Sequence, residues 1–223
     1  MKKKIVLLIT LLLVPLNVFA YSDKIIPGGN TIGITVSTKG IMVVGFYKVN
    51  GKYNKGNPEL REGDYIIKIN DKEINSVSEL ISEVDNNSKS ENIDITYIRN
   101  KKEKHTKLNL VLVEGTYKTG LYVKDNITGI GTLSYIDPSS NVYGALGHEI
   151  QESSSKSHVD IKDGSIFRNY ITGIERSIDG EPGSKTAKFY NNNVYGNIQK
   201  NTKYGIYGNY NKNYNKDNAI GIK

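Results

Sequence analysis

The 223-residue chain contains no cysteine. This absence excludes disulfide bonds, metal sites built from thiolates and a cysteine nucleophile. Covalent catalysis by this chain would therefore have to use a serine, a threonine or a carboxylate group.

The chain also has little excess charge of one sign outside its first residues. Its formal net charge of +7 includes Lys2, Lys3 and Lys4, and subtracting these three leaves +4. The other lysines form no basic stripe with stacking aromatic side chains. The sequence therefore predicts no nucleic-acid partner.

The apolar run near the N-terminus is shorter than a membrane-spanning helix. Residues 5–20 number 16, whereas a helix needs roughly 20 residues to cross a bilayer. The basic start, the apolar middle and the final Ala20 are the three parts of a secretory signal. Val18 is larger than the residue usually found at its position before a cleavage point, so an uncleaved membrane anchor is the alternative for residues 1–20. Both interpretations place the rest of the protein outside the cytoplasm, either secreted or anchored to a membrane.

Residues 25–113 have the pattern of a small β-rich domain. Short apolar runs there are separated by Gly, Asn and Asp, which is typical of strands joined by turns. One segment, 77–84, instead has apolar residues at helical spacing, and Ser76 followed by Glu79 forms a capping-box pattern at its start. The expected strands are 32–37, 41–47, 65–70, 93–99 and 106–113.

Within this domain, residues 62–74 resemble the most recognisable stretch of a PDZ domain in its bacterial arrangement. Their sequence is Glu-Gly-Asp-Tyr-Ile-Ile-Lys-Ile-Asn-Asp-Lys-Glu-Ile. Gly63-Asp64 would form the tight turn into a strand, and the isoleucines would pack that strand into the core.

The PDZ resemblance implies a peptide-binding site. PDZ domains add an extended peptide to a sheet edge and capture its terminal carboxylate with backbone N–H groups. On this resemblance, the N–H groups of Ile32, Gly33 and Ile34 would form the anion-binding loop, and Leu80 and Val84 would line the side-chain pocket. The alternative is structural, with Gly33 relieving a β-bulge and Leu80 serving as ordinary core.

Residues 114–223 contain no segment with the pattern of a long helix. Short strand-like pieces with frequent glycine follow one another, which predicts an all-β, barrel-like unit. The expected strands are 119–124, 130–136, 142–146 and 166–178. The apolar run at 219–222 has the pattern of a strand start, so we expect this unit to be the N-terminal portion of a truncated domain.

Of the three histidines, His148 is the best catalytic candidate. It follows a short apolar strand in the run Tyr-Gly-Ala-Leu-Gly-His-Glu-Ile, where an imidazole can project from a barrel rim into a cleft. His105 lies at a charged hairpin tip, where it would be solvated, and His158 could pair with a carboxylate but lacks a framing strand and turn. A His-Glu-x-x-His zinc motif fails because position 152 is Glu152. We therefore expect neither a metal nor another cofactor.

The chain as a whole resembles the SpoIVB family of sporulation peptidases. The resemblance rests on the export segment, the PDZ-like unit, and the runs at 25–29, 135–138 and 144–150. It implies a serine endopeptidase whose catalytic domain is a chymotrypsin-like β-barrel and whose general base matches His148. It also implies secretion into the space between the forespore and mother-cell membranes. There the enzyme would cut a membrane-protein regulator of an intramembrane protease, which then processes a late sigma-factor precursor.

The resemblance does not supply the rest of the triad. The family serine lies in a Gly-rich Ser-Gly-Ser-Pro setting, and its aspartate lies beyond residue 223. No serine after His148 has glycine two before and one after it, although Ser184 is nearest in character. The alternative function is therefore a non-catalytic secreted PDZ module that binds peptides, or a decayed copy of the enzyme. The expected fold is mainly β with minor α, a PDZ-like domain at 25–113 followed at 114–223 by part of a β-barrel.

Overall fold

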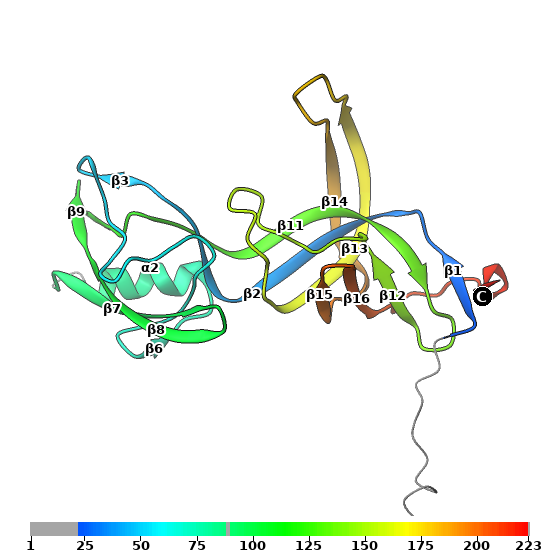
Figure 1. Cartoon of the computed structure of the whole chain (residues 1–223), viewed down its shortest axis with the longest axis horizontal. Coiled ribbons are helices and arrows are strands. Elements are labelled where there is room, and N and C mark those ends of the chain that lie inside the picture. Colours follow the sequence, from blue (N-terminus) through cyan, green and yellow to red (C-terminus); the bar gives the residue numbers. More distant parts are fainter. Residues whose placement is uncertain (1–21, 88–89, 223) are drawn as a thin grey trace, which may run out of the picture.

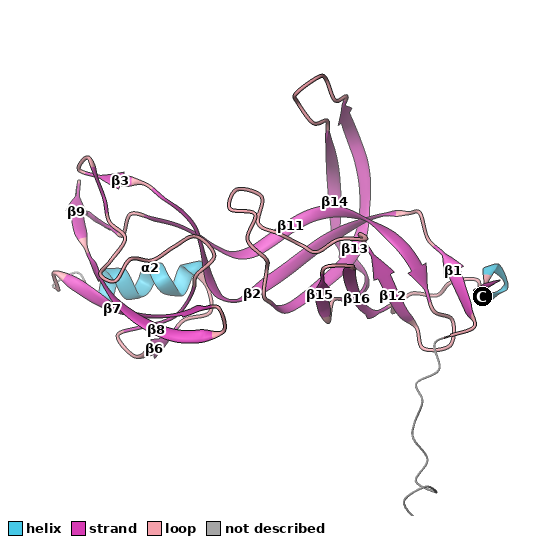
Figure 2. Cartoon of the chain, in the orientation of Figure 1, coloured by secondary structure: helices cyan, strands magenta, loops and turns pink. Residues whose placement is uncertain are grey.

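The computed structural model describes residues 22–87 and 90–222 (Figure 1). These residues form mostly strands, with one α-helix and one short 3₁₀ helix, η1 (Lys216–Asn218) (Figure 2). The predicted fold class, mainly β with minor α, is confirmed. The signal peptide or anchor predicted for residues 1–20 lies outside the described residues. Among those that are described, no helix is both long and apolar enough to cross a membrane.

Two long strands run through both lobes of the molecule (Figure 1). They are β2 (Thr31–Phe46) and β11 (Leu121–Ile136), each 16 residues long. They pair antiparallel, from Leu121 opposite Phe46 to Thr132 opposite Thr31. Each strand therefore contributes to two cores. The predicted boundary between 25–113 and 114–223 divides the sequence, but the ends of β2 and β11 cross it in space.

Gly40 marks the point at which β2 passes from one lobe to the other. Before Gly40, β2 pairs with β13 (Ile161–Glu175), and after it β2 pairs with β5 (Tyr65–Ile69). The φ of Gly40 is +110°, which a residue with a side chain rarely adopts, and a Cβ there would lie 2.8 Å from the carbonyl oxygen of Ile66. The two strands expected at 32–37 and 41–47 are thus one strand that turns at a glycine.

The lobe that contains the only α-helix of the described residues is called the helix lobe below. Its helix α2 (Val77–Asn86) begins as the capping-box pattern predicts. The Ser76 hydroxyl accepts the N–H of Glu79 at 3.2 Å, and the Glu79 carboxylate accepts the N–H of Asn75 at 2.6 Å. The other elements of this lobe are β3 (Lys48–Val49), β4 (Lys52–Tyr53), β5, β6 (Lys72–Glu73), β7 (Asn92–Arg99), β8 (Lys102–Asn109), β9 (Val111–Val113) and β10 (Thr116–Lys118).

A buried ion pair holds the predicted turn at Gly63-Asp64. The guanidinium of Arg99 donates from Nε to one oxygen of the Asp64 carboxylate at 2.7 Å and from Nη2 to the other at 2.6 Å. Asp64 is 1% exposed and also accepts the N–H of Arg61. The hydrogen bonds to the Asp64 carboxylate raise the pKa of Arg99, so the guanidinium stays charged. The turn is thereby fastened to strand β7 of the helix lobe.

The second lobe, called the barrel lobe below, is a sheet that curls into a half-barrel. Across the curl, the strands follow the order β14, β13, β2, β11, β12, β16 and β15. At the far end of the lobe, β1 pairs with both β11 and β17. The other strands of this lobe have the bounds β1 (Lys24–Pro27), β12 (Val142–Ala145), β14 (Ser184–Asn197), β15 (Lys200–Thr202), β16 (Gly205–Asn209) and β17 (Ile220–Gly221).

Two glycines let the edge strand β14 approach the end of β16 closely. An isolated bridge joins Gly196 of β14 to Tyr210, which directly follows β16. A Cβ on Gly196 would lie 2.2 Å from the carbonyl oxygen of Asn209, and one on Gly208 would lie 2.0 Å from that of Asn197. No side chain fits between backbones this close, so the glycines of the C-terminal region form a seam. Around the seam, the ring of Tyr210 packs against those of Tyr143, Tyr195 and Tyr214.

Candidate functional site

His148 stands just after strand β12, outside the barrel core. The chain leaves β12 through Leu146 and Gly147, whose φ values are +74° and +83°. Two successive residues in this left-handed region turn the backbone away from the strand. The side chain of Leu146 remains against the core, and His148 is exposed. As predicted, this imidazole projects from the rim of the barrel.

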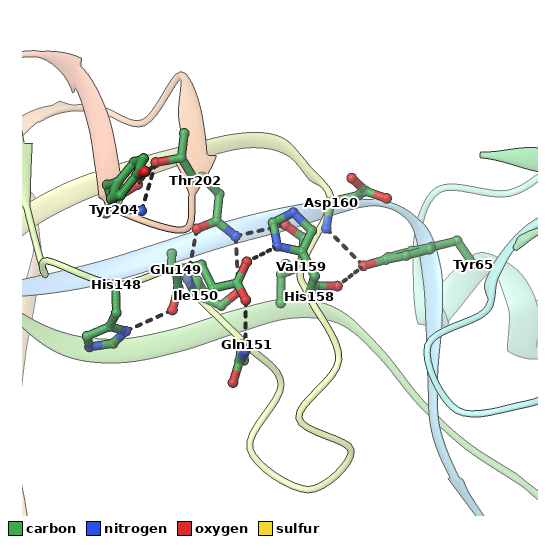
Figure 3. Close-up of polar contacts among 12 residues, drawn as sticks. Tyr65, His148, Glu149, Ile150, Gln151, His158, Val159, Asp160, Thr202 and Tyr204 are labelled. Atoms are coloured by element: carbon green, nitrogen blue, oxygen red, sulfur yellow. Dashed lines mark hydrogen bonds and ion pairs between the residues drawn. The ribbon is translucent and has the colours of Figure 1, made fainter. Parts of the chain in front are cut away.

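The His148 ring is fixed at one nitrogen by the backbone of the next residue. Nδ1 lies 2.8 Å from the carbonyl oxygen of Glu149 (Figure 3). A carbonyl oxygen can only accept, so Nδ1 carries the hydrogen of this bond. In the neutral ring Nε2 then has the free lone pair, which is the form that a general base requires.

A cleft of about 470 Å³ lies beside His148. It is lined by the segment 148–153, by the stretch 126–130 of β11, and by Ile34, Lys124 and Leu146. Ser153 also lines this cleft, but its hydroxyl donates to Glu152 at 3.4 Å. Among residues 22–87 and 90–222, no hydrogen bond joins a serine hydroxyl or a carboxylate to the ring of His148. In the described residues the cleft therefore brings no serine hydroxyl into hydrogen-bond contact with the His148 ring.

The carboxylate of Glu149 faces the other histidine of this loop (Figure 3). Its Oε2 lies 2.5 Å from Nδ1 of His158, and its Oε1 accepts the side-chain amide of Gln151 at 2.8 Å. These contacts, that of Gln151 first, lower the pKa of Glu149. The sequence indicated that His158 could pair with a carboxylate, and it does. The partner was not foreseen, because contacts made only on folding, among them the backbone bridge between Gln151 and His158, bring the loop ends together.

Glu152 holds the loop that follows His148. Its carboxylate is 1% exposed, receives the ammonium group of Lys124 at 2.8 Å, and accepts the N–H groups of Ser154 and Ser155 at 2.8 Å each. Burial would raise the pKa of Glu152, but the ammonium and the two N–H groups outweigh it and lower the pKa to about 2. Glu152, which stands where the zinc motif requires a histidine, is thus a buried residue that holds the loop in place. No group of three or more potential metal ligands gathers anywhere in the described part of the chain.

The base of the same loop is clamped by Asn201 of β15. Its side-chain oxygen accepts the N–H of Ile150 at 2.7 Å. Its amide nitrogen donates to the carbonyl oxygens of Ile150 and Val159, each at 3.0 Å. Both ends of the loop are therefore tied to one side chain. The sequence offered no signal for this role, because the contacts span more than forty residues.

The predicted carboxylate-binding loop at Ile32, Gly33 and Ile34 does not form. These residues lie inside β2, where Gly33 pairs with Ile130 of β11 on one edge and with Phe167 of β13 on the other. Because both edges are paired, the segment has no free edge to offer a peptide carboxylate, and this part of the prediction is wrong. The proposed bulge is not the reason for glycine either. A Cβ on Gly33 would lie 2.3 Å from the Phe167 ring.

The other two predicted peptide-site residues, Leu80 and Val84, are buried on the inner face of α2. They are 7% and 4% exposed and belong to the core of the helix lobe. Leu121 at the start of β11 belongs to the same core, and Val123 packs against it. The structure therefore separates Leu80 and Val84 from residues 32–34 and places them with β11.

Comparison with protein families divides the chain at the same place as the sequence analysis. Residues 31–110 match the PDZ domain, and residues 115–222 match the SpoIVB peptidase S55 family. No curated protein matches the chain significantly. His148, the loop that follows it and the β11 wall of the cleft lie in the second of these matches, whereas Ile34 of the cleft lies in the first. The chain thus consists of a PDZ domain followed by a domain that belongs to the SpoIVB peptidase S55 family.

Proposed function

We propose that the protein is a serine endopeptidase of sporulation signalling, secreted or membrane-anchored in the space between the forespore and mother-cell membranes. Its substrate would be a membrane-protein regulator of an intramembrane protease, whose cleavage triggers processing of a late sigma-factor precursor. The observation that carries the proposal is the match of residues 115–222 to the SpoIVB peptidase S55 family, with His148 of that region beside a cleft.

In the proposed reaction His148 is the general base. Its Nε2 takes the proton of a serine hydroxyl as that oxygen attacks the peptide carbonyl, and the same proton then goes to the leaving amine. The Glu149 carbonyl that accepts from Nδ1 supports this role, because it fixes the ring in the tautomer with a free Nε2. The carboxylate of Glu149 is engaged by His158, so it does not act as the acidic partner of His148.

The test uses the complete reading frame that contains these residues, reacted with a fluorophosphonate probe that labels active serines. Replacing the base by His148→Ala is expected to lower labelling and peptide cleavage by roughly 10³-fold or more. His105→Ala is the matched control, because its ring is exposed on β8 in the other lobe. Mass spectrometry of the labelled wild type identifies the nucleophile.

Two outcomes would contradict the catalytic role. Labelling of the His148→Ala variant at the wild-type rate would remove His148 as the base. Absence of any labelled serine in the wild type would favour the second candidate function, a secreted non-catalytic module that binds peptides through its PDZ domain. The PDZ match at residues 31–110 and the lack of a serine at His148 in the described residues favour this second candidate.

A further inference from the structure

In the helix lobe, the edge of β2 that could receive a peptide is already occupied by another segment of the chain. PDZ domains bind an extended peptide as an added strand. Here the edge of β2 is paired with the start of β11, in the order Leu121 with Phe46, Tyr122 with Gly45, Val123 with Val43 and Lys124 with Met42. The opposite edge of β2 is paired with β5 at Ile41 and Met42. The added strand in this lobe is thus a segment of the chain itself.

The side chains of this segment alternate as those of a bound peptide do. Leu121 is 7% exposed and lies in the core with Leu80 and Val84 of helix α2, whereas Tyr122 is 57% exposed. Val123 again packs inward against the same core. Strand residues that alternate in this way present one face to a pocket and the other to solvent.

The end of the segment delivers a carboxylate to helix α2. Oδ2 of Asp125 accepts the N–H of Val77, the first residue of the helix, at 2.8 Å. The carbonyl oxygen of Asp125 accepts the hydroxyl of Thr38 at 3.2 Å. A negative group is stabilised at a helix N-terminus, where backbone N–H groups lack partners within the helix.

We propose that residues 121–125 are the built-in ligand of the PDZ domain. They hold the position of an added peptide strand by their backbone pairing, their inward side chains and the side-chain carboxylate of Asp125. An external extended peptide with the same apolar alternation and a carboxylate near its end binds there only when this segment withdraws. The proposal rests on the PDZ match and not on catalysis, so its test has a binding readout.

The same segment also reaches the loop of His148. Lys124, between the inward Val123 and the capping Asp125, is the ammonium partner of the buried Glu152. Withdrawal of residues 121–125 would therefore leave a buried carboxylate without its partner. Binding of an external peptide and the order of the His148 loop are then linked, and the linkage acts in both directions.

The test measures the fluorescence anisotropy of a fluorescein-labelled peptide with the sequence of residues 119–125, mixed with the full chain. Leu121→Asp weakens the internal segment and is expected to bind the probe at least tenfold more tightly than the wild type. If this variant loses its folded circular dichroism spectrum, Leu121→Ala replaces it. Tyr122→Asp is the matched control, because Tyr122 lies on the solvent face of the same strand, and it should bind as weakly as the wild type.

A disulfide bond that locks the internal segment in place tests the proposal in the opposite direction. A Cβ on Gly45 would lie 3.8 Å from the Cβ of Tyr122, which is the usual separation in a disulfide, and the chain has no other cysteine. With Gly45→Cys and Tyr122→Cys added to the Leu121→Ala variant, oxidation should abolish probe binding and reduction should restore it. Wild-type binding as tight as that of the weakened variants, a folded Leu121→Ala variant that does not bind, or binding unaffected by oxidation would each overturn the proposal.

Discussion

In the helix lobe a turn is held by contacts between side chains, whereas in the barrel lobe the sheet is closed by the absence of side chains. The Asp64–Arg99 ion pair holds the turn of the helix lobe. Gly196 and Gly208 allow the strands of the barrel lobe to approach closely. The contrast bears on what a sequence can reveal. A charged pair beside a Gly-Asp turn belongs to a recognisable local motif, but a glycine seam depends on two backbones that meet only after folding.

The two lobes are nevertheless built on the same two strands. The first part of β2 and the second part of β11 lie in the barrel lobe, and their other ends lie in the helix lobe (Figure 1). A change in one lobe is therefore expected to reach the other through β2 and β11.

The largest effect is expected in the helix lobe, from Asp64→Asn. The variant leaves the guanidinium of Arg99 partly buried without its carboxylate, and breaking such a pair costs about 3–5 kcal/mol. The free energy of unfolding in urea measures the loss. Asp94→Asn is the matched control, because its ion pair with Lys107 is exposed and 3.7 Å long, and such pairs contribute about 0–1 kcal/mol. Equal losses in both variants would contradict the role of the buried pair.

The next effect is expected at the Lys124–Glu152 ion pair, which connects the two lobes. It should appear in the pH dependence of the free energy of unfolding. Because the pKa of Glu152 falls from its ordinary 4.5 to about 2 on folding, its contribution is fully present above pH 4.5 and is lost as the pH falls towards 2. A pKa shift of this size corresponds to a contribution of roughly 3 kcal/mol to the free energy of unfolding. Unfolding measured between pH 5 and pH 2 should show this extra loss in the wild type and not in Glu152→Gln.

Glu103→Gln serves as the control for that experiment, since Glu103 is exposed on β8. Its pH profile should follow that of the wild type. A Glu152→Gln profile that also follows the wild type would show that the Lys124–Glu152 contact carries no stability.

The smallest of these effects is expected at the barrel seam, from Gly208→Ala. Its Cβ would overlap the carbonyl oxygen of Asn197, and such overpacking typically costs about 1–3 kcal/mol. Gly129→Ala in β11 is the control, because a Cβ there meets nothing within 4 Å. Thermal unfolding compares the two variants. A Gly208→Ala variant as stable as Gly129→Ala would mean that the edges of the half-barrel do not meet at this glycine.

Local signals in the sequence predicted local structure. The helix at α2, its Ser76 cap and the Gly63-Asp64 turn depend on residues within a few positions of one another, and all three are present. The projection of His148 also followed from its neighbours, because the turn at Leu146 and Gly147 is built into the adjacent chain.

Local sequence patterns did not predict the contacts between distant residues. Residues 32–34 have the composition of a PDZ carboxylate loop, but their place in β2 is decided by pairing with β11 and β13, some 95 to 135 residues further along the chain. The pairing of Glu149 with His158 likewise depends on a bridge across a loop. No spacing rule identifies such contacts before the fold is known.

Hydrogen exchange of the wild-type protein, followed by mass spectrometry, tests most directly whether β2 and β11 serve both lobes. The backbone amides of 42–46 and 121–124 that face the β2–β11 pairing should exchange far more slowly than those of an unstructured chain, as should those of 32–36 and 127–131, because the strands are continuous. Exchange of 121–124 at the rate of an unstructured chain, with the barrel segments still protected, would contradict both the shared strands and the built-in PDZ ligand.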